Sequence, residues 1–283
     1  MRPSIPFNPR VHRPVPRGFV ARIGRGVIDI ITFWGGAMLT LLMAVGSIVT
    51  PGGAARRVAR RVTLAQVFFT GVQGLSTVTA IALIIGATFM LQVVVAAPGL
   101  PGEVVGQFLV AVVLRELAPL VTVIIVASRS GTAIATELGN MKANREVLGL
   151  ASMGIDPGRY IVLPRVVGVI SGVMVLTVYF AVLSLIGSVI IALVLGTPSV
   201  SAIQHGVAET LSAVDLFLLA VKAGGGGLLV GWLCCHFGLE VRSSSTEVPT
   251  MTGRAVIRSV FGCVLYNFAV TLGYYGLSGS LMR

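Results

Sequence analysis

Five long apolar stretches limit this chain to a membrane protein. A helix needs about 20 predominantly apolar residues to cross the hydrocarbon core of a bilayer. A soluble protein of 283 residues could not bury a chain that is 55% hydrophobic and only 11% charged. We therefore predict an all-α fold whose five transmembrane helices cover residues 75–97, 104–127, 166–195, 216–236 and 259–277.

The uneven distribution of basic residues predicts the orientation. If the chain leaves the cytoplasm at the first span, 18 of its 21 Lys and Arg residues fall in segments 1–74, 128–165 and 237–258. None falls in the opposite loops, 98–103 and 197–215. Cytoplasmic loops carry such an excess, so we place the N-terminus in the cytoplasm and the C-terminus outside. This explains the net charge of +11 without a nucleic acid partner.

A sixth apolar stretch, residues 30–49, has basic residues on both flanks, and a crossing there would put one basic cluster outside. We predict instead an interfacial helix and a shallow hairpin over 18–50, within a basic cytoplasmic N-terminal region, 1–62. Residues 63–283 would then form the five-span domain. The alternative, a signal peptide, would have a long proline-rich n-region and lacks a convincing cleavage site.

Motifs typical of catalysis, nucleotide binding or metal binding are scarce in this sequence. We find no nucleophile elbow and no pair of catalytic carboxylates. Neither of the two lysines lies in a phosphate-binding loop, so any nucleotide-driven work would belong to another subunit. We therefore predict no catalytic residue, no metal site and no cofactor in this chain. The histidines are too scattered for a metal site, and the cysteines lie in apolar runs that favour plain burial: His12, His205, His236; Cys234, Cys235, Cys263.

The segment between the second and third spans, 129–165, is long for a connection. Within it, Met141 to Met153 is typical of a short amphipathic helix, and the following Gly154-Ile-Asp-Pro157 indicates a turn. Such a segment is either a solvated loop or a lever that a cytoplasmic motor can push.

Several ordered blocks in this region resemble the signature of the MlaE/YrbE permeases, the membrane subunits of lipid-transporting ABC systems that work with MCE proteins. The blocks cover about 50 residues closely, and the order of the spans agrees over most of the remainder. They are Arg115-Glu-Leu-Ala-Pro119, Ala127-Ser-Arg-Ser-Gly-Thr-Ala133, Glu137-Leu-Gly-x-Met141, Met153-Gly-Ile-Asp-Pro157 and Arg159-Tyr-Ile-Val-Leu-Pro-Arg165.

The resemblance implies a permease subunit in the bacterial inner membrane that dimerises and holds phospholipid between protomers. A cytoplasmic ABC ATPase dimer, which binds ATP and Mg, would drive it beneath a periplasmic MCE hexamer. A small STAS-type accessory protein is a further candidate partner. The second permease copy is expected to be identical, with a heterodimer as the open alternative.

The resemblance also assigns a coupling helix to the segment after the second span. Its expected contacts with the ATPase are Met141, Lys142, Arg145, Glu146, Met153 and Asp156. The chain departs from the family pattern here, since relatives commonly carry an acidic pair or Glu-Gln at residues 145 and 146. Leu148 and Ala151 likewise stand where acidic residues are frequent.

Three charges lie inside predicted spans. Arg115 and Glu116 are about 15 Å from the outer end of the second span, and Lys222 is at a similar depth in the fourth. Neighbours on a helix point about 100° apart, so Arg115 and Glu116 should have different partners. A Glu116–Lys222 pair is consistent with the depths. These three are our predicted lipid-binding residues, with Arg115 meeting a lipid phosphate; the alternative is that the charges only fix helix packing.

Other features favour structural roles. The run Gly224–Gly227 predicts close helix packing, and Pro119 predicts a kink that frees carbonyl groups. Tyr274 and Tyr275 suit an interfacial anchor, and the outer loop 197–215 offers a docking surface for an external partner.

Two other functions stay open. One is an ABC permease for a small polar solute, which the scarcity of intramembrane polar groups disfavours. The other is a membrane scaffold that recruits partners without transporting anything.

Overall fold

The structure is a computed structural model that describes residues 53–97, 99–195, 200–241 and 244–281. This part of the chain is helical and has no strand, which confirms the predicted all-α class. Its α-helices are α2 (Gly53–Ala96), α3 (Gly102–Phe108), α4 (Ala118–Val126), α5 (Thr132–Ala143), α6 (Glu146–Ser152), α7 (Leu163–Val194), α8 (Val200–Thr210), α9 (Ala213–Leu239) and α10 (Val248–Leu281). Three π-helical segments, η2 (Leu109–Leu117), η3 (Ala127–Gly131) and η4 (Gly158–Val162), and one 3₁₀ turn, η5 (Ser245–Glu247), join them.

All five predicted spans are present, and each is longer than its apolar stretch. Hydropathy marks only the part of a helix that suits lipid, whereas the backbone hydrogen bonds continue into the polar flanks. The helical segments of the described residues that are long and apolar enough to cross a membrane are Thr63–Ala96, Gly102–Ala143, Tyr160–Val194, Ala213–Leu239 and Ser245–Gly276. The protein is therefore a multi-pass membrane protein.

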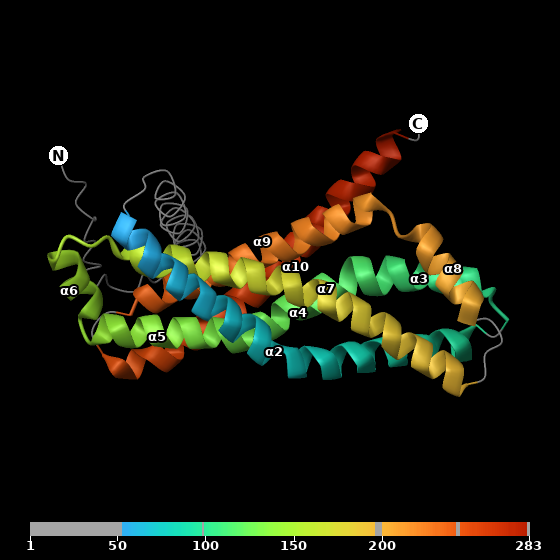
Figure 1. The fold of residues 1–283 in the computed structure, drawn as a ribbon, viewed down its shortest axis with the longest axis horizontal. Coiled ribbons are helices and arrows are strands. Elements are labelled where there is room, and N and C mark those ends of the chain that lie inside the picture. Colours follow the sequence, from blue (N-terminus) through green and yellow to red (C-terminus); the bar gives the residue numbers. More distant parts are fainter. Residues whose placement is uncertain (1–52, 98, 196–199, 242–243, 282–283) are drawn as a thin grey trace, which may run out of the picture.

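The long helices run along the longest axis of the molecule (Figure 1). Helix α6 lies at one extremity and α3 with α8 at the other; we call these the α6 end and the α8 end. Toward the α8 end, the last turns of α10 run beside the first turns of α9 and away from the rest of the bundle (Figure 1).

The prediction of one helix over Met141–Met153 is wrong. Helix α5 runs on from the second span and ends at Ala143, and α6 begins only at Glu146. Between them Arg145 has a φ of 61°, a left-handed conformation that no helix continues through. The predicted turn after α6 is confirmed by Gly154, whose φ of 77° suits glycine.

Helix α9 packs against other helices on several sides, because its four consecutive glycines face different neighbours. A Cβ atom on Gly224 or Gly227 would meet α7, one on Gly225 would overlap the Tyr266 ring of α10, and one on Gly226 would meet Val123 of α4. Successive residues point about 100° apart, so four glycines leave room around most of a turn. The close packing predicted for this run is confirmed.

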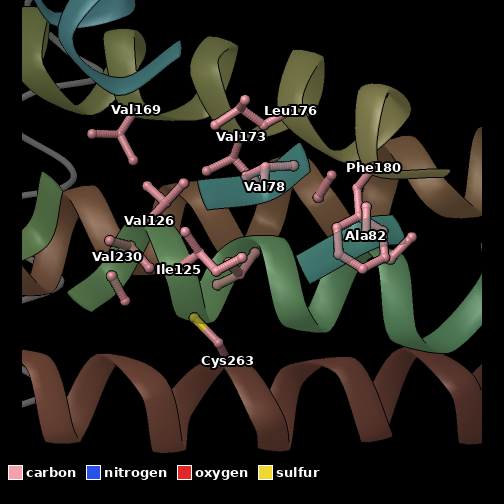
Figure 2. Packing of buried hydrophobic residues seen from close by; sticks show 14 of the residues in the cluster. Val78, Ala82, Ile125, Val126, Val169, Val173, Leu176, Phe180, Val230 and Cys263 are labelled. Carbon is pink, nitrogen blue, oxygen red and sulfur yellow. The ribbon is translucent and has the colours of Figure 1, made fainter. Parts of the chain in front are cut away.

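The core is mostly apolar, although some charged side chains, among them Arg165, Asp215 and Lys222, are also buried. Figure 2 shows side chains of α7 (Val173, Phe180), α2 (Val78) and α4 (Ile125) meeting between the helices, with Cys263 of α10 pointing toward them. All three cysteines are buried and free, as small apolar side chains would be.

The predicted outer loop is partly helical. Residues Val200–Thr210 form α8, and a Cβ on Gly206 would overlap the backbone of Glu103 in α3, so the two helices are in close contact. His205 and Glu209 on α8 are exposed and lie 3.3 Å apart.

The predicted interfacial hairpin over 18–50 lies outside the described residues. The described chain starts with α2, which continues without a break across residue 62, the predicted end of the N-terminal region.

Candidate functional site

Two ion pairs connect the second span to the fourth within the helical bundle. Residues Arg115 and Glu116 lie on η2, and Asp215 and Lys222 lie on α9. Lys222 Nζ is 2.8 Å from Glu116 Oε1, and Arg115 Nε is 2.6 Å from Asp215 Oδ1. We call these four residues the charged cluster. The predicted Glu116–Lys222 pair is confirmed, and the two neighbours on η2 have different partners as expected.

Lys222 has every hydrogen of its ammonium group satisfied. It donates to Glu116 Oε1 at 2.8 Å, to the Arg115 carbonyl at 2.9 Å and to Thr271 Oγ1 of α10 at 2.8 Å. Its side chain is fully buried, whereas that of Glu116 is 34% exposed. An ammonium group has three donors, so none remains for a ligand unless one of these bonds breaks.

The Arg115 carbonyl is available to Lys222 because of Pro119. In an α-helix this carbonyl would accept from the N–H of residue 119, which proline lacks. The preceding turns are π-helical, with the Ala118 N–H bonded to the Val113 carbonyl five residues earlier. The predicted freeing of carbonyls near Pro119 thus has a specific result, a backbone acceptor for an intramembrane cation.

Asp215 is the residue of the charged cluster that the sequence analysis missed, because residues 197–215 were assigned to an outer loop. It lies in the first turn of α9, where Ser212 and Asp215 form a capping box. The Ser212 N–H and hydroxyl both donate to Oδ2, at 3.0 and 2.9 Å, which leaves Oδ1 for Arg115. The Ser-x-x-Asp spacing before an apolar run is the signal that could have identified this residue.

An apolar pocket of about 140 Å³ adjoins the Arg115–Asp215 pair. The pair contributes to its wall, and apolar side chains of η2, α7 and α9, with Leu211 between α8 and α9, supply the rest. Asp215 is 5% exposed and Arg115 18% exposed, and Arg115 also hydrogen-bonds the side chain of Tyr275 on α10. The site therefore combines room for hydrocarbon with one partly accessible guanidinium group.

The α6 end carries the predicted coupling residues. Met141 and Lys142 are half-buried in the last turn of α5, whereas Arg145, Glu146 and Met153 are exposed. Asp156 accepts a hydrogen bond from the Gly158 N–H at 2.9 Å and so shapes the turn toward η4.

Large apolar side chains lie exposed on and just after α6, although this helix is part of a short connection between two spans. Leu148 is 67% and Met153 68% exposed, while Val147 is buried and anchors the helix. Exposed large apolar side chains at one place indicate a partner surface.

Two arginines from the blocks that resemble the permease signature connect neighbouring helices. Arg165 Nη2 on α7 lies 2.6 Å from Glu137 Oε1 on α5, and Arg129 on η3 donates to the backbone carbonyl of Gln73 on α2. Arg165 is buried, so this ion pair links α7 to α5, which itself packs against α9 and α10.

Comparison with known families gives one clear result. The family model for the permease MlaE matches residues 63–272, which is most of the chain and covers four spans completely and most of the fifth.

Individual relatives agree with that result. The intermembrane phospholipid transport system permease protein MlaE of Haemophilus influenzae is 26% identical over 91% of this chain and 98% of its own length. The chloroplastic protein TRIGALACTOSYLDIACYLGLYCEROL 1 of Arabidopsis thaliana is 25% identical over 79% of this chain, and the match spans 64% of that relative. A probable ABC transporter permease of Synechocystis is 27% identical over 75% of this chain and 81% of its own length.

Proposed function

This chain belongs to the MlaE permease family, and on that premise we propose that it is the permease subunit of an ABC-type phospholipid transporter. It would move lipid between the bacterial inner membrane and a periplasmic MCE protein. The chain would be no enzyme itself, because ATP and Mg would bind a separate ATPase.

The observation that carries the proposal is the charged cluster beside an apolar pocket. Charges inside a membrane are costly and mark sites of function by default. Arg115 is the accessible cation of the cluster, while Lys222 is fully buried. Apolar walls suit acyl chains, and a guanidinium group suits a phosphate. Lys222 and Glu116 then position Arg115 through its own backbone carbonyl.

The orientation follows from the positive-inside distribution of basic residues. The α6 end would face the cytoplasm, where α6 docks on an ABC ATPase dimer, with a STAS-type protein as a further partner. The α8 end would face the periplasmic MCE hexamer, and the C-terminus would lie on the same side. A second permease copy completes the transporter, as a homodimer in our proposal.

Mass spectrometry of molecules that copurify with the assembled complex tests this function. We expect phospholipid; a polar solute would favour the small-solute permease, and no bound molecule would favour a scaffold.

The variant Arg115→Ala should reduce bound phospholipid severalfold while the complex still assembles. Because Arg115→Ala leaves Asp215 buried without its cation, Arg115→Ala/Asp215→Ala is the matched control for misfolding. Equal lipid content in the wild type and both variants would contradict a lipid site at Arg115.

A further inference from the structure

The charged cluster is electrically balanced, and its balance restricts the headgroup that it can accept. Two cations and two carboxylates are paired within the membrane-spanning helices, so the cluster has no spare positive charge. Resting on the proposed lipid-transport function, we propose that the site selects phospholipids whose headgroup has no net charge. A zwitterionic headgroup would place its phosphate on Arg115 and its ammonium on Asp215.

An unpaired charge is costly in the low-dielectric interior of a membrane protein. A phosphate that binds Arg115 takes that cation from Asp215 and leaves a buried carboxylate without a partner. A zwitterion supplies an ammonium group for the same carboxylate, so every charge stays paired. An anionic lipid such as phosphatidylglycerol brings no replacement cation.

The surroundings of the site do not offer one either. Lys222 keeps its three hydrogen bonds. Among the described residues at the α8 end, the exposed formal charges are the acidic Glu103 and Glu209. The net negative charge of an anionic headgroup would therefore be repelled by these carboxylates.

The geometry at Asp215 supports exchange of one cation for another. Ser212 holds Oδ2 through two hydrogen bonds, so the carboxylate stays in place when Arg115 moves. Arg115 and Asp215 both line the apolar pocket, so the exchange would take place at its wall. When the partly exposed guanidinium turns away from Asp215, the donors that it used there become available to the phosphate.

A competition experiment tests the selectivity. The purified complex is equilibrated with mixed micelles of equimolar palmitoyl-oleoyl phosphatidylethanolamine and palmitoyl-oleoyl phosphatidylglycerol, and the retained lipids are quantified by mass spectrometry. The identical acyl chains leave only the headgroup to differ. We expect the wild type to retain roughly tenfold more phosphatidylethanolamine than phosphatidylglycerol, which is the difference in affinity that one charge-assisted hydrogen bond would give.

The variant Asp215→Asn should abolish this preference or reverse it, since it keeps the shape of the cap and removes the charge. Glu240→Gln removes an exposed carboxylate at the opposite end of α9 from Asp215 and should keep the wild-type ratio. Should Asp215→Asn fail to assemble, Arg115→Gln/Asp215→Asn removes both charges together and should bind less phospholipid, with no preference between the two headgroups.

An equal ratio in the wild type, a preference for phosphatidylglycerol, or a preference unchanged in the Asp215 variants would overturn the inference and leave lipid transport standing. A wild-type complex that retains neither phospholipid would overturn the proposed function, and the inference with it.

Discussion

Lys222 shows how a single residue links three spans. Its ammonium group contacts a carboxylate and a backbone carbonyl of η2 and a hydroxyl of α10. Thr271 also donates to Glu116 at 3.1 Å, so the three side chains form a closed set of hydrogen bonds. In the water-free core of a bilayer, such a set stabilises the fold only while every member keeps its hydrogen-bond partners.

Lys222→Met should therefore destabilise the protein by about 3 kcal/mol, because Glu116 and the Arg115 carbonyl lose their cation. The double variant Lys222→Met/Glu116→Gln should recover much of that loss, since the unpaired carboxylate is gone. Unfolding midpoints of the detergent-solubilised protein in an SDS titration measure both. Equal losses in the single and double variants would contradict the pairing.

At the scale of elements, α9 organises the bundle through its glycines. Tyr266 of α10 lies against Gly225, and its hydroxyl donates to the Val221 carbonyl at 3.0 Å. The position of α10 beside α9 therefore depends on the missing side chain at Gly225.

Gly225→Ala should lower stability by about 2 kcal/mol, because the added methyl group overlaps the Tyr266 ring. The same change at Gly273 of α10, where a Cβ would meet nothing within 4 Å, is the matched control and should be neutral or slightly stabilising. Thermal unfolding in detergent compares the two. Equal effects would mean that helix propensity, and not the contact with Tyr266, sets the outcome.

A different element, α6, should control coupling. Glu146→Lys reverses an exposed charge on its first turn, so we expect ATP hydrolysis by the assembled transporter to lose its response to lipid, with the permease still folded. Glu240→Lys, an exposed carboxylate just after α9, is the control and should behave like the wild type. ATPase assays with and without added phospholipid give the answer, and normal lipid stimulation in Glu146→Lys would argue against α6 as the coupling element.

At the scale of the whole molecule, the spans followed from the sequence because apolar length alone determines them. The Glu116–Lys222 pair followed from counting residues from the same side of the membrane. Asp215 did not, since hydropathy cannot show how far a polar helix start lies inside the bundle. The break at Arg145 was also beyond reach, because the left-handed conformation there has neither glycine nor proline to signal it.

The orientation of the whole molecule is open to a direct test by cysteine labelling. The native cysteines are at most 3% exposed, so the wild type should give no background with a membrane-impermeant maleimide. We expect Glu209→Cys, on α8, to react in cells whose inner membrane is intact, because the positive-inside rule places the α8 end outside. Glu146→Cys, on α6, should react only in inverted vesicles or after lysis. The reverse pattern would place the α6 end outside, where no cytoplasmic ATPase could reach it, and would contradict the proposed transport mechanism.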